Sequence, residues 1–271
     1  MENTVPADAA KVRRILMALD TASSILPAME AAAGLALGLH AELAGLFIED
    51  EGLLRSAGLP FAREFGYASA RVSPLAPASV ERALRAQAEQ LRRLLAATAA
   101  RLSLAWTLEV VRGEVRRSAL ARAGPADLLV LGRSEYAWPG ARRRADPAQR
   151  FPALAARPVA VIFDGSATAP RALSIGSTLC DVTDSKLTVL IPAASAKAYD
   201  ELRQRAARQL IGRPHASYLF LPDTRPESVI RTARSRHFGA LLWPGRIEDL
   251  TPAQLTELPC PVVLIPSHFN H

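Results

Sequence analysis

The sequence contains few cysteines and few aromatic residues. Its 271 residues include two cysteines, Cys180 and Cys260, which stand far apart and in no metal-ligand spacing. This pattern argues against a disulfide scaffold and predicts two small core residues in a protein of a reducing compartment. We predict no metal site. Aromatic residues make up 6% of the chain, so a surface that stacks nucleic-acid bases is not expected.

Long apolar runs are also lacking. The longest apolar region near the N-terminus is interrupted by His40 and Glu42, so no segment qualifies as a membrane span. Residues 1–10 are polar and alanine-rich, without the basic start and apolar stretch of a signal peptide. We therefore expect a cytoplasmic protein with no membrane partner.

Positive charge exceeds negative charge, and the basic residues are almost all arginine. The 33 Lys and Arg residues against 26 Asp and Glu residues give a formal net charge of +7. Such a balance admits nucleic acid or anionic lipid as a partner. Because no long basic block stands apart, we interpret the arginines as solvated helix faces. Binding to nucleic acid is a minor hypothesis, which predicts an affinity that falls steeply with salt.

An apolar strand that ends in aspartate occurs twice in the chain. Residues 12–20 end in Asp20, and small hydroxyl residues follow. Residues 158–166 pass from an apolar run into Asp-Gly-Ser, which predicts a buried strand that ends in a turn. A helical pattern follows each copy. The duplication predicts two domains, residues 11–157 with an excursion at 52–78 and a shorter domain at 158–271.

Strands and helices are expected to alternate in both halves. This alternation predicts parallel sheets covered by helices on both faces. In such folds a ligand binds where the strand order reverses, outside the carboxyl ends of the strands. We expect Asp20 and Gly132 to line one crevice, and Asp164 and Gly245 to line the other. The expected strands are 12–20, 43–48, 106–111, 127–132, 159–164, 187–191, 217–221, the run from 241 and 261–266; the expected helices are 25–41, 79–103, 114–123, 147–155, 169–182, 194–211, 226–237 and 252–258.

Residues 79–103 give the clearest helical pattern. Apolar residues at helical spacing mark one face, and Ser79 is the expected N-cap. The pairs Glu81–Arg85 and Glu89–Arg93 have the spacing of favourable ion pairs along a helix. The excursion at 52–78 is rich in glycine, proline and apolar residues, which predicts a packed segment with short helical turns.

From about Lys11 to Pro266 the chain resembles the universal stress protein family in its tandem, two-domain form. The resemblance is carried by the strand endings at Asp20 and Asp164-Gly165-Ser166, by strand 127–132, and by residues 49–64. It implies an α/β fold of two doubly wound, Rossmann-like parallel sheets of the adenine-nucleotide alpha-hydrolase type. The strand order is expected to be roughly 3-2-1-4-5, and a stress-response role is implied.

One branch of that family binds ATP through Gly-x-x-Gly, nine residues, and Gly-Ser or Gly-Thr after the fourth strand. Glycines let backbone N–H groups approach phosphate, and the hydroxyl adds a donor. Here the pattern starts at Gly132 and Gly245 but is then lost, because acidic residues replace the second glycine and Pro259 lacks an N–H. We therefore predict no intact ATP site and no cofactor. The replacing residues are Glu135 and Ala145-Asp146 in the first half, and Glu248 and Leu258-Pro259 in the second.

The candidate ligand-binding residues are those expected at the two crevices. An alternative function is nucleotide (ATP or AMP) binding with weak hydrolysis, through Asp20, Gly132 and the arginine loop 142–144, because guanidinium groups can replace backbone donors around phosphate. The candidates are Ala18, Asp20, Ile48, Gly132, Arg133 and Ser134 in the first half, and Asp164, Gly165, Ser166 and Gly245 in the second.

No catalytic constellation stands out in the sequence. The five histidines are scattered, and neither Ser134 nor Ser166 lies in a nucleophile-elbow sequence. A Walker loop or dinucleotide fingerprint follows neither first strand. Asp20 and Asp164 are interpreted as residues that cap a helix or close a turn. We expect a non-enzymatic stress-response or regulatory protein that acts through a protein partner or an unidentified small ligand.

The junction between the halves shows one convincing strand. Each domain of the family ends in a fifth strand, yet between Gly132 and Asp164 only residues 159–163 have the pattern of a strand. We therefore expect the first sheet to have four strands of its own, with 159–163 between the halves or wholly in the second. The two domains are expected to pair as an intramolecular pseudo-dimer, and a homodimer is left open.

Overall fold

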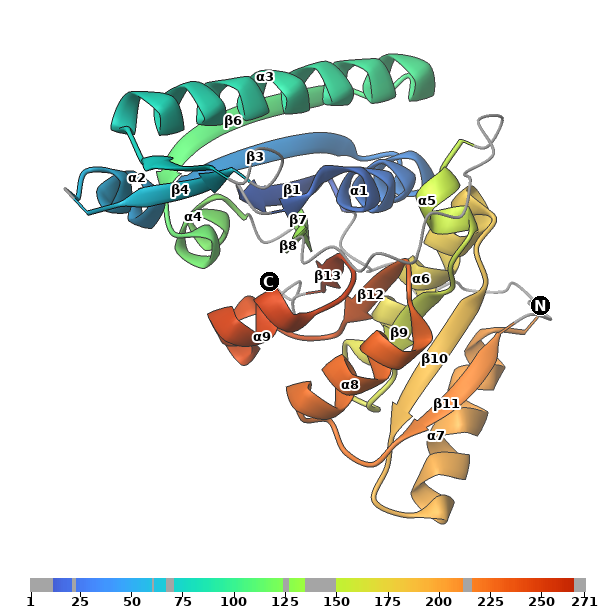
Figure 1. Ribbon diagram of the computed structural model, residues 1–271. Coiled ribbons are helices and arrows are strands. Elements are labelled where there is room, and N and C mark those ends of the chain that lie inside the picture. The colour runs from blue at the N-terminus through green and yellow to red at the C-terminus, as the bar shows by residue number, and fades with distance from the viewer. Residues whose placement is uncertain are drawn as a thin grey trace.

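A computed structural model describes residues 12–20, 23–59, 61–66, 71–123, 127–134, 150–211 and 216–265. Its centre is a nine-stranded sheet in the order β11-β10-β9-β12-β13-β7-β1-β3-β6 (Figure 1). The strands are β1 (Arg14–Asp20), β3 (Glu42–Asp50), β6 (Trp106–Gly113), β7 (Asp127–Leu131), β9 (Val159–Ile162), β10 (Leu187–Pro192), β11 (Ser217–Leu221), β12 (Ala240–Trp243) and β13 (Val262–Leu264). Two short ribbons, β2 (Ser23–Ser24) with β8 (Arg133–Ser134) and β4 (Arg63–Gly66) with β5 (Arg71–Pro74), lie outside this sheet.

The sheet joins two parallel halves through one antiparallel pair. β6, β3, β1 and β7 are parallel neighbours, as are β11, β10, β9, β12 and β13. β13 then pairs antiparallel with β7, with Val263 opposite Val130. The second half has the expected 3-2-1-4-5 order, whereas the first has 3-2-1-4 and is completed by β13. The strands of the two halves therefore run in opposite directions, and their carboxyl ends lie at opposite ends of the sheet.

Helices cover both faces of the sheet. The helices are α1 (Ile25–Leu39), α2 (Glu51–Ala57), α3 (Pro77–Leu102), α4 (Val115–Arg122), α5 (Pro152–Ala155), α6 (Ala169–Thr183), α7 (Ala196–Gln209), α8 (Pro226–Arg236) and α9 (Pro252–Glu257). Apolar side chains of α1, α3, α6 and α7 form one core with one face of the sheet, and those of α4 and α8 join the core on the other face. Among the described residues, no helix is both long enough and apolar enough to cross a membrane.

The apolar strands are buried on both sides, as their sequences predict. In β1, Met17 belongs to the core under α1, whereas Leu16 belongs to the core on the opposite face. In β9, Val161 and Ile162 divide in the same way. A strand between two helical layers needs apolar residues at successive positions, which explains the continuous apolar runs.

Helices α1 and α6 join the two halves on one face of the sheet. A Cβ at Gly34 would lie 2.8 Å from Leu179 Cδ1, and one at Gly38 would lie 2.6 Å from Thr178 Cγ2. The absence of side chains at these glycines therefore lets α1 approach α6 closely. Because each helix follows the first strand of its half, the contact pairs equivalent elements of the two halves.

The prediction for strand 159–163 is confirmed: β9 lies between β10 and β12, wholly in the second half. β7 takes β1 and β13 as its neighbours, so the described part of the first half supplies four strands to the main sheet. β8 pairs with β2 and not with β7. Residues 135–149, where a further strand would contradict the prediction, lie outside the described residues. The domain boundary at 157/158 stays a prediction.

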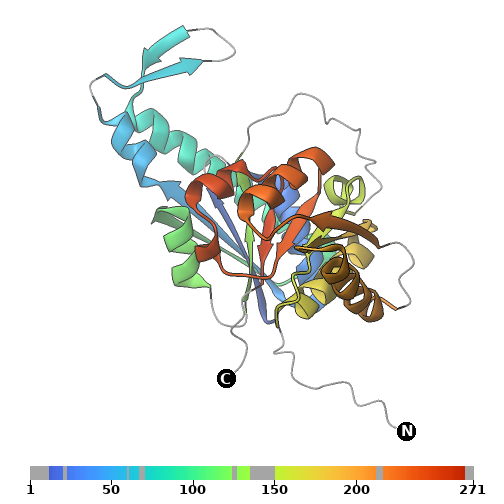
Figure 2. The same cartoon turned by 90° about the horizontal axis from the view of Figure 1, so that it is seen from below.

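The excursion at 52–78 differs partly from its prediction. Helix α2 packs through Leu54 and Ala57 against a small cluster on α3, as a packed segment should. The β4–β5 hairpin was not predicted, and it projects from the body of the molecule (Figure 2). Leu59 and Phe61 lead into it and are 45% and 75% exposed. The apolar residues of this segment are therefore not all buried.

Two details of helix α3 correct the sequence interpretation. The helix begins at Pro77 with Ala76 as N-cap, so Ser79 lies inside the first turn and is not the cap. Proline at the first helical position has a fixed φ that suits this start. The Glu81–Arg85 pair forms at 3.2 Å, but Glu89 pairs with Arg92 at 3.4 Å instead of Arg93.

Candidate functional site

The first crevice lies where β1 and β7 end side by side. Gly132 N donates to Ala18 O at 3.0 Å, and Asp20 is opposite Ile48 in the register of β1 and β3. The pairing of first and fourth strands is therefore confirmed. It brings Ala18, Asp20, Ile48 and Gly132 together, four of the six residues predicted for this half.

The other two residues predicted for the first crevice belong to a short two-stranded ribbon outside the main sheet. Arg133 and Ser134 form β8, which pairs antiparallel with Ser24 and Ser23 of β2. The segments that leave β7 and β1 thus bond to each other beyond the main sheet. Helix α9 of the second half contacts β8. Backbone that would surround a phosphate in a glycine loop is here part of a ribbon.

Beside this crevice, an ion pair joins the ends of β3 and β6. Arg112 Nε donates to Glu49 Oε2 at 2.8 Å, and Glu49 is 8% exposed. The hydrogen bond to Glu49 raises the pKa of Arg112. The next residue, Asp50, is the N-cap of α2 and accepts from Gly52 N. Glu49 and Asp50, the last two residues of β3, are therefore engaged in structural contacts.

In the second half, Asp164 closes the turn between β9 and α6. Its Oδ1 accepts from Ser166 N at 2.9 Å, and Ser166 Oγ lies 3.1 Å from Thr168 Oγ1. Thr168 is the N-cap residue of α6. The interpretation of Asp164 as a residue that closes a turn is confirmed, and both side chains of the Asp-Gly-Ser sequence are engaged locally.

Gly165 has little free space above it. Its φ is +81°, and a Cβ there would lie 2.8 Å from Leu202 Cδ2 of α7. Glycine is required for both reasons, because φ is positive and the neighbouring side chain is close. Helix α7 therefore packs over the turn where a ligand of the second half was predicted.

The backbone of the loop after β12 is hydrogen-bonded by a carboxylate of the same loop. Arg246 N donates to Asp249 Oδ2 at 2.7 Å, and Gly245 N donates to Trp243 O at 2.9 Å. A Cβ at Gly245 would lie 2.7 Å from both Asp249 Oδ2 and Trp243 Nε1. The glycine thus makes room for an indole and a carboxylate of the same chain. The backbone N–H groups of Gly245 and Arg246 are therefore bonded within the loop.

The acidic residue at the second glycine position is also paired. Glu248 Oε2 lies 3.3 Å from Arg246 Nε, and both side chains are about half exposed. Leu258, at the place of the final Gly-Ser or Gly-Thr pair, is 1% exposed and belongs to the core. The corresponding residues of the first half, Glu135 and Ala145-Asp146, lie outside the described residues, as does the arginine loop 142–144.

Sequence reasoning missed Asp249 and Trp243, which fill the second loop. One local signal was present: Asp249 follows Gly245 by four residues and lies in a short 3-10 helix. An aspartate in such a turn commonly bonds nearby backbone. The position of Trp243 gave no signal, because a tryptophan at a strand end is read as core.

Comparisons with known proteins place the fold. No family model matches the chain, and no curated protein matches it. A universal stress protein from Archaeoglobus fulgidus DSM 4304 aligns over 93% of this chain and 98% of its own, with a TM-score of 0.51 and 10% identity. The cytoplasmic domain of a prokaryotic cation chloride cotransporter aligns over 93% and 95%, with a TM-score of 0.41 and 10% identity.

A third similar structure, a universal stress protein in complex with cAMP, aligns over 40% of this chain and 95% of its own, with a TM-score of 0.33 and 17% identity. Scores below 0.5 carry no inference, so the Archaeoglobus structure is the informative one. It matches nearly the whole of both chains. The predicted resemblance is confirmed at the level of the fold: this chain has the Rossmann-like α/β fold of a universal stress protein.

Proposed function

We propose that this is a non-enzymatic stress-response or regulatory protein whose crevices no longer bind ATP through a phosphate loop. One observation carries the proposal: the Asp249 carboxylate accepts the Arg246 N–H, 2.7 Å away, in the loop after β12. The role in a stress response rests on the fold and on the sequence resemblance.

Electrostatics explains why this loop should exclude phosphate. A phosphate loop binds through free backbone N–H groups that point at the anion. A carboxylate that accepts such an N–H forms a strong, charge-assisted hydrogen bond. An incoming phosphate would have to displace Asp249 and would also lie near the Glu248 carboxylate. Because like charges repel, ATP would lose charge complementarity as well as the backbone donors.

The first half supports the proposal through its backbone pairing. Residues Arg133 and Ser134 follow Gly132, where the glycine loop begins in the ATP-binding branch, and they pair with β2. Opening this ribbon to admit phosphate would break the pairing and disturb the contact with α9. Phosphate binding here therefore carries a conformational cost that a preformed loop does not have.

Calorimetric titration with Mg-ATP tests the proposal directly. We expect no affinity in the micromolar range for the whole chain, and no release of inorganic phosphate above that of buffer with Mg-ATP. Low-micromolar affinity would overturn the proposal. The double variant Glu248→Gly/Asp249→Gly is the matched control, because it removes both carboxylates and frees the Arg246 N–H; any ATP affinity should be higher in this variant.

A second candidate is nucleotide (ATP or AMP) binding in the first half, with weak hydrolysis. It is favoured by the convergence of Asp20, Ile48 and Gly132 at one crevice, with residues 142–144 as the phosphate contact. If titration detects a nucleotide, replacing all three arginines at 142–144 by glutamine should abolish binding. Binding that survives this change excludes the arginine mechanism.

The proposed role also has a cellular test. The amount of the protein should rise under starvation, oxidant or respiratory stress, measured by quantitative immunoblotting against a constitutively expressed protein. An amount that is constant under all three conditions would contradict a stress-response role while leaving the result of the ATP titration unaffected.

A further inference from the structure

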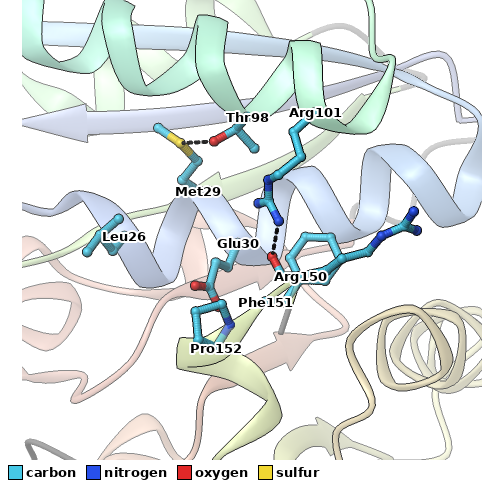
Figure 3. Close-up of a pocket in the computed structure, with 8 residues that line it drawn as sticks. All are labelled: Leu26, Met29, Glu30, Thr98, Arg101, Arg150, Phe151 and Pro152. Carbon is cyan, nitrogen blue, oxygen red and sulfur yellow. Dashed lines mark hydrogen bonds between the residues drawn. The ribbon is translucent and has the colours of Figure 1, made fainter. Parts of the chain in front are cut away.

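A cavity of about 330 Å³ lies between α1, α3 and the segment that leads into α5 (Figure 3). Its volume is at the lower end of the range of small-molecule sites. The described residues that line it include none of those assigned to the two crevices. Its lining residues are Leu26, Met29 and Glu30 of α1, Thr98 and Arg101 of α3, and Arg150, Phe151 and Pro152.

One part of the cavity wall is apolar. Phe151 and Met29 are each 2% exposed, whereas Leu26 is 58% exposed and lies toward solvent. The sulfur of Met29, on α1, accepts a hydrogen bond from Thr98 Oγ1 at 3.3 Å. These side chains offer a small apolar surface that a hydrocarbon group of a ligand would cover.

The other part of the wall is cationic. Arg101 Nη1 donates to Arg150 O at 2.8 Å (Figure 3). A guanidinium has five N–H donors in a planar fork, and this bond uses one of them. The fork matches the geometry of a carboxylate, which it can bind through two parallel hydrogen bonds. Arg101 therefore has the chemistry to hold an anion at the cavity wall.

Glu30 limits the charge that this cavity accepts. Its Oε2 accepts from Ala153 N at 2.8 Å and from Leu154 N at 2.9 Å, so the carboxylate already holds the start of α5. Burial raises the pKa of Glu30, although these two hydrogen bonds and the Arg101 charge oppose the shift. A ligand with two negative charges would place the second one near this carboxylate. A single negative charge is the better match to Arg101.

We propose that this cavity binds a small amphipathic monocarboxylate. The apolar body of the ligand lies against Leu26, Met29 and Phe151, and its carboxylate accepts from Arg101. The site is independent of the ATP crevices. All the lining residues belong to the first half. The adjoining helix α5 contacts the second half, where Ser185 Oγ donates to Leu154 O at 2.9 Å.

Methionine NMR gives a direct test with octanoate as the probe. The chain has three methionines, Met1, Met17 and Met29, so methyl-13C labelling gives three resonances, which Met29→Leu assigns. Met17 is fully buried in β1 and serves as the internal control. We expect octanoate to shift the Met29 resonance saturably and to leave Met17 in place. No shift of Met29 at millimolar octanoate would overturn the proposal.

Variants separate the role of charge from that of apolar contact. Arg101→Gln should weaken octanoate binding about tenfold or more, as expected for loss of a hydrogen bond between charged groups, and should leave octan-1-ol binding unchanged. Arg92→Gln on the same helix, outside the cavity, is the matched control. Leu26→Asp changes an exposed residue and should also weaken octanoate binding. Wild-type octanoate affinity in Arg101→Gln, or tighter binding of octyl phosphate than octanoate, would overturn the assignment of a monocarboxylate.

Discussion

At the residue scale, two aspartates determine the turns that follow strands in the second half. Asp164 accepts from Ser166 N after β9, and Asp249 accepts from Arg246 N after β12. A carboxylate that satisfies backbone N–H groups replaces hydrogen bonds that water or a bound anion would otherwise make. Both turns are therefore complete without a ligand.

The Asp249 contact predicts a measurable contribution to stability. Asp249→Ala should lower the free energy of unfolding by about 0.5–1 kcal/mol, as expected for loss of an exposed side chain that caps backbone N–H groups. Asp249→Asn keeps an acceptor and should lose less. Urea denaturation followed by circular dichroism measures both. Equal stability of the alanine variant and the wild type would contradict the structural role of this carboxylate.

A second prediction concerns Asp223, which precedes α8. The Arg225 guanidinium donates to its Oδ2 at 2.6 Å, and this bond, with one from Ser228, lowers the pKa of Asp223 from 3.8 to about 2. Because the folded-state pKa is lowered, the stabilisation is present above about pH 3.8 and is lost as the pH falls through about 2. Arg225→Ala should raise the pKa toward its ordinary value, measured by NMR titration of the carboxyl carbon. An unchanged pKa would contradict this cause.

Sequence reasoning reached Asp164 but not Asp249, and the difference is physical. Asp164 stands directly after a long apolar run, so its place at a strand end is visible in one dimension. Asp249 gains its role from the path of the chain around Trp243, which packs beneath Gly245. Arg101 and Glu30 are similar, because residues about 70 positions apart meet only when α1 and α3 pack together.

At the element scale, the close contact of α1 with α6 rests on glycine. Gly34 of α1 faces Leu179 and Thr183 of the other half. Such close packing of two helices needs a residue without a side chain. In a helix that makes no close contact, a glycine is unfavourable by about 1 kcal/mol relative to alanine.

This contact predicts the effect of a larger residue. Gly34→Val should destabilise the protein by about 1–3 kcal/mol, because its side chain would overlap Leu179 in a packed core. Gly58→Ala is the matched control: this glycine is exposed, has an ordinary helical φ of −78°, and has space for a Cβ. Thermal unfolding of both variants is the measurement. A wild-type Tm for Gly34→Val would show that the helices do not approach as described.

The elements that sequence reasoning found best were those with strong periodicity. Strand β1 and helix α3 were predicted to within a few residues, because burial on two faces or on one stripe leaves a clear pattern. The β4–β5 hairpin was missed, since its two strands of four residues each are too short to give a clear alternation of apolar and polar residues. Local propensity also misplaced the start of α3 at Ser79, where Pro77 begins the helix.

At the scale of the whole molecule, one core extends through both halves. Residues of β1 and α1 from the first half share a hydrophobic cluster with β9 and α6 from the second. β13 continues the sheet from one half into the other. Among the described residues, neither half has a separate core on this face, so their stabilities should be coupled.

Coupling predicts a single unfolding transition, which tryptophan fluorescence measures. The chain has three tryptophans, Trp106, Trp138 and Trp243. A variant that keeps only Trp106 reports on β6 in the first half, and one that keeps only Trp243 reports on β12 in the second. After replacement of the others by phenylalanine, both should give the same fraction unfolded as circular dichroism of the same variant. Two separated transitions within either variant would show that the halves unfold independently.

The sequence by itself determined the nine strands of the main sheet, most of the helices, the internal duplication and the absence of an intact glycine loop after Gly245. These features depend on local patterns of burial and on residue types that backbone geometry requires. Only the tertiary structure decided that β13 completes the first half, that β2 pairs with β8, and that α1 and α3 enclose a cavity. Each depends on contacts between distant segments, whose free energy comes from shared burial and from matching surfaces rather than from any pattern along the chain.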